Sequence, residues 1–218
     1  ALSQWRSSWL SREGVLAIAA LAVFGLHAAL WLLLGWRSGM LGLLAAVLSG
    51  ATVYATGMIY AQLKTVPRWN IRLTPFCFMA FALASGALLV AALVALTGDD
   101  EGRATGAAIF LLLVAWAAKW VWWQKAEKAT LDSAGASIEA ATGLGSIGTV
   151  HQFEAPHTGP NYLMKEMVFE VGRRRAGALR KLALGLGAAA PLLLILLSSK
   201  LGPLVLILAL AAMMAGLM

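Results

Sequence analysis

Residues 63–76 of the sequence read LKTVPRWNIRLTPF and lie between two long apolar stretches. Pro67 has no amide hydrogen and disfavours helix at the residue before it, so the upstream helix is predicted to end near Val66. Thr74 followed by Pro75 is typical of a helix start, with the threonine as N-cap and the proline at the first helical position. The stretch is therefore predicted to be a rigid turn of about eight residues between two helices.

The apolar stretches on both sides of this turn determine the class of protein. Of the 218 residues, 61% are hydrophobic and 12% are charged, whereas a soluble domain is nearer half apolar and a quarter charged. About 20 consecutive apolar residues span a bilayer as a helix. Six spans are predicted, at residues 14–36, 40–63, 74–97, 105–123, 182–197 and 203–218. The sequence thus predicts an all-α, polytopic membrane helical bundle that forms a single integral membrane domain over residues 1–218.

Basic residues are concentrated on one predicted side of the membrane. The formal net charge is +7, and thirteen of the seventeen Lys and Arg residues lie in the N-terminus, the 64–72 turn and the 125–181 loop, against three on the opposite side. Loops rich in Lys and Arg stay in the cytoplasm. This side is therefore predicted to be cytoplasmic, and the positive charge calls for no nucleic-acid partner.

The 125–181 loop, within the membrane domain, has two parts. Residues 126–160 are small, polar and Gly-rich, which is typical of an irregular connector with one helical piece. From residue 162, apolar side chains recur at helical spacing ahead of a basic cluster, which favours an amphipathic helix at the membrane interface. A solvated loop that ends in a positive-inside cluster explains the arginines equally well.

Glu13 is the polar residue that most favours a chemical role. It lies just ahead of the first apolar run, in WLSREGVLA. As a structural residue it would occupy the first helical turn, where a carboxylate complements the helix dipole, with Ser11 as the N-cap. As a functional residue it would accept a proton from a ligand that arrives through the lipid. Arg12 would either orient this carboxylate or act only as a topogenic charge.

The 63–76 stretch contains arginine and tryptophan residues that a turn between two helices does not require. Cytoplasmic turns are commonly basic and interfacial tryptophan is frequent, so Arg68, Trp69 and Arg72 are explained by topology alone. Arginine and tryptophan are also enriched at interaction hot spots, which favours a docking surface for a partner.

Three further residues are candidates for chemistry. His27, midway along the first span, is interpreted as a hydrogen-bonded packing residue, because no second histidine lies in a span to complete a haem site. Lys119, near the end of the fourth span, is expected to extend to the headgroups. Cys77 is the single cysteine and has no neighbours for a metal site.

Three segments resemble the membrane anchor subunit family of dimethyl sulfoxide reductase: ALSQWRSSWLSREGVLA (1–17), MIYAQLKTVPRWNIRLTPFCF (58–78) and NYLMKEMVFEVGRRRAGALRK (161–181). They are similar to the approach to the family's third helix, to its central T-V-P-x-W and T-P signature, and to a basic segment of one branch. The resemblance implies an eight-helix protein, of which this chain lacks the first two helices and the extreme C-terminus.

The resemblance also implies a function. Members of the family lie in the bacterial cytoplasmic (inner) membrane, bind and oxidise menaquinol from the quinone pool, and pass electrons to an iron–sulfur subunit, which docks together with a molybdopterin catalytic subunit. The anchor does not hold the catalytic centre and has no haem or metal. The resemblance assigns Glu13 as the proton acceptor from quinol, Arg12 and Tyr60 as further quinol-binding residues, and Lys64, Arg68, Trp69 and Arg72 as docking residues.

Two alternatives remain open: a small-solute transporter of an unrelated family, and a purely structural anchor without a quinol site. Transporters tend to have broken helices and charged groups near the bilayer midplane. Here Pro191 and a few glycines are the candidate breaks, and acidic residues are absent from the interiors of the predicted spans. This pattern weighs against ion coupling.

Overall fold

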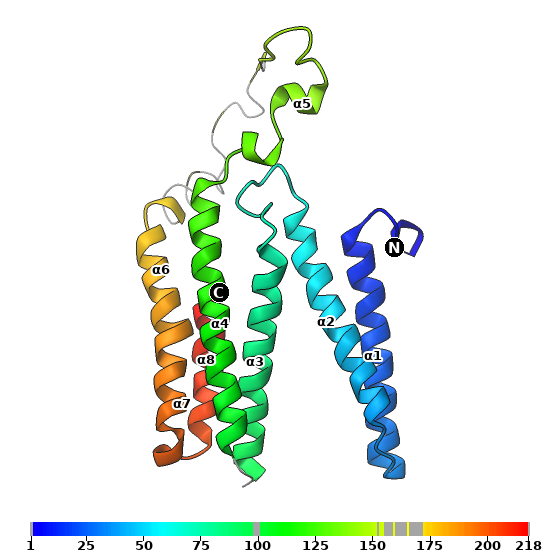
Figure 1. The fold of residues 1–218 in the computed structure, drawn as a ribbon, viewed down its shortest axis with the longest axis vertical. Coiled ribbons are helices and arrows are strands. Elements are labelled where there is room, and N and C mark those ends of the chain that lie inside the picture. Colours follow the sequence, from blue (N-terminus) through cyan, green and yellow to red (C-terminus); the bar gives the residue numbers. More distant parts are fainter. Residues whose placement is uncertain are drawn as a thin grey trace. The chain divides into compact units, whose positions relative to one another are not determined.

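The computed structural model describes residues 2–97, 101–151, 153–154, 159, 165 and 172–217. Within these ranges all regular secondary structure is helical, which confirms the predicted all-α class (Figure 1). Five segments are long and apolar enough to cross a membrane: α1 (Trp9–Leu34), α2 (Gly39–Ala61), α3 (Thr74–Thr97), α4 (Glu101–Lys128) and the continuous run of α6 (Ala176–Leu184), η4 (Gly185–Ala189) and α7 (Ala190–Leu201). The sixth predicted span corresponds to α8 (Leu204–Leu217), a shorter apolar helix.

Short helices lie outside these spans. They are η1 (Leu2–Gln4), η2 (Asp132–Ala134) and α5 (Ile138–Thr142), and the last two confirm that the 126–160 connector contains helix. Ser137 caps α5. The carboxyl group of Glu139 accepts hydrogen bonds from the Glu139 backbone amide and from the Ser137 side chain, and these bonds lower its pKa. Most of the amphipathic helix predicted from residue 162 falls outside the described residues, and described α-helix resumes at Ala176.

The chain divides into two compact units. The first comprises Ala1–Ala82 and Ala117–Ala136, and the second comprises Leu83–Trp116 and Ser137–Met218. Helices α3 and α4 therefore each contribute residues to both units. That the whole chain forms one membrane domain stays a prediction.

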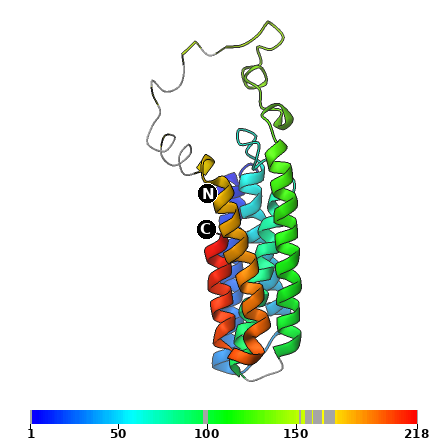
Figure 2. The same ribbon diagram turned by 90° about the vertical axis from the view of Figure 1, so that its left-hand side faces the viewer.

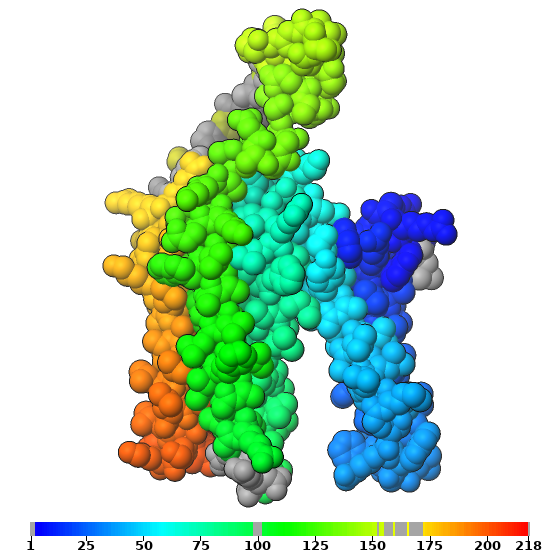
Figure 3. Space-filling view, viewed as in Figure 1, coloured from blue at the N-terminus to red at the C-terminus, as the bar shows by residue number. Residues whose placement is uncertain are grey.

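In the first unit, α1 and α2 form an antiparallel hairpin whose side chains lie against each other (Figures 1 and 3). Gly35 ends α1 in the left-handed region, at φ 66°, where its amide donates to the Leu30 and Trp31 carbonyls. The Ser38 hydroxyl accepts from the Leu41 amide and caps α2. The hairpin thus aligns the start of α1 with the end of α2.

The start of α1 differs from the prediction. Ser8 is the N-cap, since its hydroxyl accepts the Ser11 amide, and Ser11 is a buried residue inside the helix. Glu13 therefore lies more than one turn inside α1, beyond the first turn where a carboxylate offsets the helix dipole. The predicted capping role of Ser11 and the dipole role of Glu13 are both wrong.

The end of α2 also differs from the prediction. The helix ends at Ala61, several residues before Val66, and Asn70 Nδ2 donates to the Ala61 carbonyl. This amide supplies a donor to one of the last carbonyls of the helix, which have no partner within it. The connection is therefore longer than predicted and covers residues 62–73.

Thr74 is the first residue of helix α3, whereas the sequence predicts it as the N-cap just ahead of the helix. The Cys77 amide already donates to the Leu73 carbonyl, so Thr74 is the first helical residue and not the N-cap. The buried Thr74 hydroxyl instead donates to the Trp69 carbonyl at 2.8 Å and accepts from Trp122 Nε1 at 2.9 Å. One hydroxyl thus ties the 62–73 turn to both α3 and α4.

Gly57 allows α2 and α3 to approach closely. A Cβ atom at this position would lie 2.6 Å from Pro75 Cα, which is too close for any side chain. Small residues let membrane helices pack backbone to backbone. The approach fixes the end of α2 against the start of α3.

In the second unit, the run from α6 to α7 contains a π-helical turn, η4, beside α8 (Figure 2). A π-helical turn pairs residues five apart, so some of its backbone groups lack the partners that they would have in an α-helix. The Gly187 carbonyl in this turn accepts a hydrogen bond from buried Trp116 Nε1 at 2.7 Å. The backbones of Gly187 and Gly216 are in contact, so neither position has room for a Cβ atom.

Candidate functional site

Glu13 faces α2 within the α1–α2 hairpin. Its Oε1 lies 2.6 Å from the hydroxyl of Thr56, which donates to it. Both residues are half-buried. An ionisable side chain within a membrane-spanning helix is costly to maintain and usually has a functional reason. The geometry therefore supports a chemical role for this carboxyl group.

The Thr56 hydroxyl has a second acceptor within reach, the Thr52 carbonyl at 3.0 Å. A hydroxyl has a single hydrogen and can also accept. When Glu13 is ionised, Thr56 can donate to the carboxylate. When Glu13 carries a proton on Oε1, it can donate to Thr56 while Thr56 donates to Thr52. The hydrogen bond between Thr56 and Oε1 of Glu13 can therefore be kept in both protonation states of the carboxyl group.

Arg12 does not orient Glu13. Its guanidinium donates to the Trp5 carbonyl at 3.0 Å and to the Arg6 carbonyl at 2.9 Å, and it lies 4.3 Å from the centre of the Trp9 ring. Within the described residues no ion pair joins Arg12 to Glu13. Arg12 thus fastens the first residues of the chain to the start of α1, and a direct role in quinol binding stays a prediction.

Tyr60 lies one helical turn beyond Thr56 on α2, so both residues are on the same side of that helix. Its ring stacks on Phe78 at 5.4 Å and meets the Trp69 ring edge-on at 5.3 Å. The structure thus places Glu13, Thr56 and Tyr60 along one end of the α1–α2 hairpin. This arrangement offers a carboxyl group beside an aromatic cluster.

The predicted docking residues are all on the outside of the first unit. Lys64, Arg68, Trp69 and Arg72 are exposed. The backbone beneath them is fixed by the Asn70 bond to Ala61 and the Thr74 bond to Trp69. The cations are therefore presented on an ordered turn.

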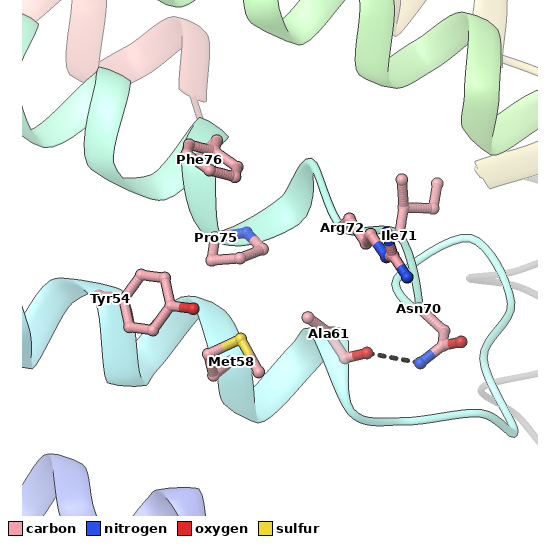
Figure 4. A pocket seen from close by; sticks show the side chains of 8 residues that line it. All are labelled: Tyr54, Met58, Ala61, Asn70, Ile71, Arg72, Pro75 and Phe76. Atoms are coloured by element: carbon pink, nitrogen blue, oxygen red, sulfur yellow. Dashed lines mark hydrogen bonds between the residues drawn. The ribbon is translucent and has the colours of Figure 1, made fainter.

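A cavity of about 470 Å³ opens at this end of α2. Figure 4 shows Tyr54 and Met58 of α2 on one side, Pro75 and Phe76 of α3 opposite, and Arg72 from the turn at one end. At 100° per residue, Tyr54 and Met58 are each about 160° around α2 from Thr56. The cavity and the Glu13–Thr56 pair therefore lie on different faces of α2.

Two residues outside the candidate site bear on the predictions. His27 packs toward α2, with Nε2 3.7 Å from the position a Cβ would take at Gly42. Its buried Nδ1 has no hydrogen-bond partner among the described residues, so the hydrogen bond predicted for it is not found. Lys119 lies over Trp122, with Nζ 4.1 Å from the ring centre.

Sequence reasoning missed Thr56. The signal was present in TVYAT (52–56), where two threonines four residues apart interrupt an apolar span. Their spacing places both hydroxyls on one face of the helix. In the part of the chain that the structure describes, no three His, Cys, Asp or Glu side chains gather as a metal site would require.

The chain is similar to proteins of one family. The family model described as DMSO reductase anchor subunit (DmsC) matches residues 1–217. Among curated proteins, one of the subunits of the sulfite dehydrogenase of Allochromatium vinosum is 29% identical over 93% of the chain. The chain spans 65% of the length of that relative. No solved structure matches the chain.

Proposed function

The chain belongs to the DMSO reductase anchor subunit (DmsC) family, and from this membership we propose that it is the membrane subunit of a molybdoenzyme complex that oxidises menaquinol. The proposed location is a bacterial cytoplasmic membrane. The observation that carries the proposal is the Glu13 carboxyl group, which lies inside a membrane helix and is held by the Thr56 hydroxyl. Membership of this family also weighs against the small-solute transporter.

In the proposed reaction, menaquinol becomes menaquinone and releases two protons and two electrons. One quinol hydroxyl gives its proton to the Glu13 carboxylate, which acts as a general base, and the second proton leaves to water. The two electrons would leave one at a time to an iron–sulfur cluster of the docked partner. Thr56 keeps the carboxyl group in place before and after it takes the proton, since its hydroxyl can donate or accept.

The partner is proposed to dock on the exposed 62–73 turn. Lys64, Arg68, Trp69 and Arg72 lie outside the first unit, where a partner can reach them. Arginine and tryptophan commonly dominate the binding energy of protein interfaces. Docking here would bring an electron acceptor to the end of the hairpin that holds Glu13.

The relative favours a second candidate function, in which the same site reduces menaquinone instead of oxidising menaquinol. A sulfite dehydrogenase, as its name says, removes electrons from its substrate. In a complex of that kind, this chain would receive electrons rather than deliver them. In this version menaquinone takes up two electrons and two protons, and protonated Glu13 donates one of the protons. The roles of Glu13 and Thr56 are the same in both directions.

Replacing Glu13 with Gln tests the proposal, because Gln keeps the size of the side chain and an oxygen that accepts from Thr56. General acid–base groups contribute about a hundredfold or more to rate, so quinol-dependent turnover of the complete complex should fall by about that factor. Turnover with a soluble artificial electron donor, which bypasses the anchor, should not change.

Glu127→Gln serves as the matched control, because Glu127 is an exposed carboxylate in the last turn of α4 rather than on α1 or α2. It should retain quinol-dependent turnover. Full quinol-dependent turnover of Glu13→Gln would show instead that the chain is a structural anchor or that another group takes the proton. Assaying quinol oxidation and quinone reduction in the same membranes decides the direction.

A further inference from the structure

The cavity beside Arg72 has a polar end and an apolar end. Asn70 and Arg72 belong to the turn, whereas Met58, Pro75 and Phe76 supply apolar walls (Figure 4). Tyr54 lies seven residues before Ala61 on α2, which places it about 10 Å farther along the helix. The cavity thus runs from a cation at the end of the helix toward the interior of the span.

The cation at the polar end has no counter-charge in the part of the chain that the structure describes. Arg72 is exposed, the residues that line the cavity include no carboxylate, and within the described residues no ion pair involves Arg72. A guanidinium group suits phosphate, because it can donate two parallel hydrogen bonds to it. Basic pockets between membrane helices characteristically bind anionic lipid headgroups.

We propose that the cavity beside Arg72 binds an anionic phospholipid. The phosphate lies at the Arg72 guanidinium, and one acyl chain lies along α2 between Met58 and Phe76 toward Tyr54. The polarity of the cavity, apolar along the helices and cationic at the turn, matches this amphiphile. A membrane protein meets such lipids at high local concentration.

The quinol is a less suitable occupant. It is neutral and must lose protons, yet the described residues that line the cavity include no carboxylate or imidazole. Met58 and Thr56 lie about 160° apart around α2, and the Tyr54 ring at the inner end of the cavity meets the Trp9 ring of α1 at 6.1 Å. The lipid site does not require the quinol chemistry, but it shares Arg72 with the proposed docking surface.

The test measures how much phosphatidylglycerol stays bound to the complete complex after exchange in vesicles of phosphatidylglycerol and phosphatidylcholine, followed by detergent extraction and mass spectrometry. Arg72→Gln removes the cation, and Ala61→Phe fills the cavity. Arg68→Gln is the matched control, since Arg68 is an exposed cation of the same turn that does not line the cavity.

The loss of a hydrogen-bonded contact between a guanidinium and a phosphate corresponds to about a tenfold change in affinity. Retained phosphatidylglycerol should therefore fall about tenfold in Arg72→Gln. It should also fall in Ala61→Phe, because the acyl chain loses its space, but not in Arg68→Gln. Millimolar inorganic phosphate should not displace the lipid, because it lacks the acyl chain.

Three results would overturn the proposal. Equal losses in Arg72→Gln and Arg68→Gln would assign the lipid to the general surface charge. Displacement by inorganic phosphate would show a simple anion site. Loss of a bound menaquinone analogue in Ala61→Phe, with phosphatidylglycerol unchanged, would assign the cavity to the quinone.

Discussion

The Thr56 hydroxyl has one hydrogen and two acceptors, the Glu13 carboxyl group and the Thr52 carbonyl. Its orientation therefore follows the protonation of Glu13. The hydroxyl thereby holds the Glu13 carboxyl group at one position on the α2 surface.

Replacing Thr56 with Val should lower the rate of quinol oxidation. Valine cannot donate a hydrogen bond, so the Glu13 carboxylate loses its contact with α2 and is held less well toward the quinol. A hydrogen bond to a charged group contributes about 1.5–3 kcal/mol, so quinol-dependent turnover per complex should fall about tenfold or more. Thr56→Ser keeps the hydroxyl and should keep the parent rate.

A purely structural role of Thr56 predicts a different outcome. Valine would then lower the amount of complex in the membrane and leave the turnover per complex unchanged. Unchanged turnover per complex in Thr56→Val, with Glu13→Gln inactive, would limit Thr56 to packing the hairpin. Unchanged turnover in both variants would contradict the proposed site altogether.

The limits of sequence reasoning at this scale are visible in the serines ahead of Glu13. Ser8 and Ser11 are both suitable caps, and their local patterns do not distinguish them. The structure uses Ser8, which moves Glu13 from the first turn of α1 to a position facing Thr56. The importance of Glu13 was predicted from family resemblance, whereas its partner depends on the pairing of α1 with α2.

At the scale of elements, the 62–73 turn shows which boundaries the sequence determines. The start of α3 was predicted to within a residue, because a Thr-Pro pair acts locally. The end of α2 was missed by several residues, because Asn70, nine positions away, supplies the hydrogen bond at Ala61. A capping contact between distant residues has no local sequence signature.

Charge reversal on this turn tests docking. Lys64→Glu combined with Arg68→Glu removes two exposed cations that do not line the cavity. If the partner's surface is complementary in charge, most of the iron–sulfur subunit should leave the membrane fraction, because like charges at an interface cost several kcal/mol. The measurement is the amount of that subunit sedimenting with membranes, compared in cells that express equal amounts of the anchor.

Lys125 and Lys128 at the end of α4 provide the control. Reversing both changes the net charge by the same amount at residues that are not part of the turn. If that pair releases the partner as effectively as Lys64 and Arg68, general surface charge holds the partner. Continued attachment in the Lys64 and Arg68 variant would leave the stretch as a turn alone.

At the scale of the whole molecule, hydropathy predicted the class and the approximate spans, but not the packing of the helices. Many of the buried residues are alanines, which provide little sequence signal for which helix they contact. The contact of Gly187 with Trp116 and Gly216 joins residues far apart in the chain. Such close approaches follow from the fold of each unit, not from periodicity.

Replacing Gly187 with Ala should destabilise the second unit. The added methyl group would overlap the Trp116 ring, whose indole also donates to the Gly187 carbonyl. Overpacking of this kind costs about 1–3 kcal/mol, which should lower the midpoint of thermal unfolding in detergent. Gly106→Ala in α4 of the same unit meets open space and should be neutral or stabilising. Equal midpoints for the two variants would contradict the close packing.

The α1–α2 hairpin has a consequence for biogenesis. Only 6% of the most apolar stretch of α1 is buried within the chain, so this helix can enter the lipid before later helices are synthesised. Glu13, however, emerges from the ribosome well ahead of Thr56. A carboxyl group at the centre of a lone helix costs about 2.5–3.5 kcal/mol on insertion, and Glu13, nearer the helix end, bears less. The two helices therefore insert most favourably as a pair, with the hydrogen bond formed as they enter the membrane together.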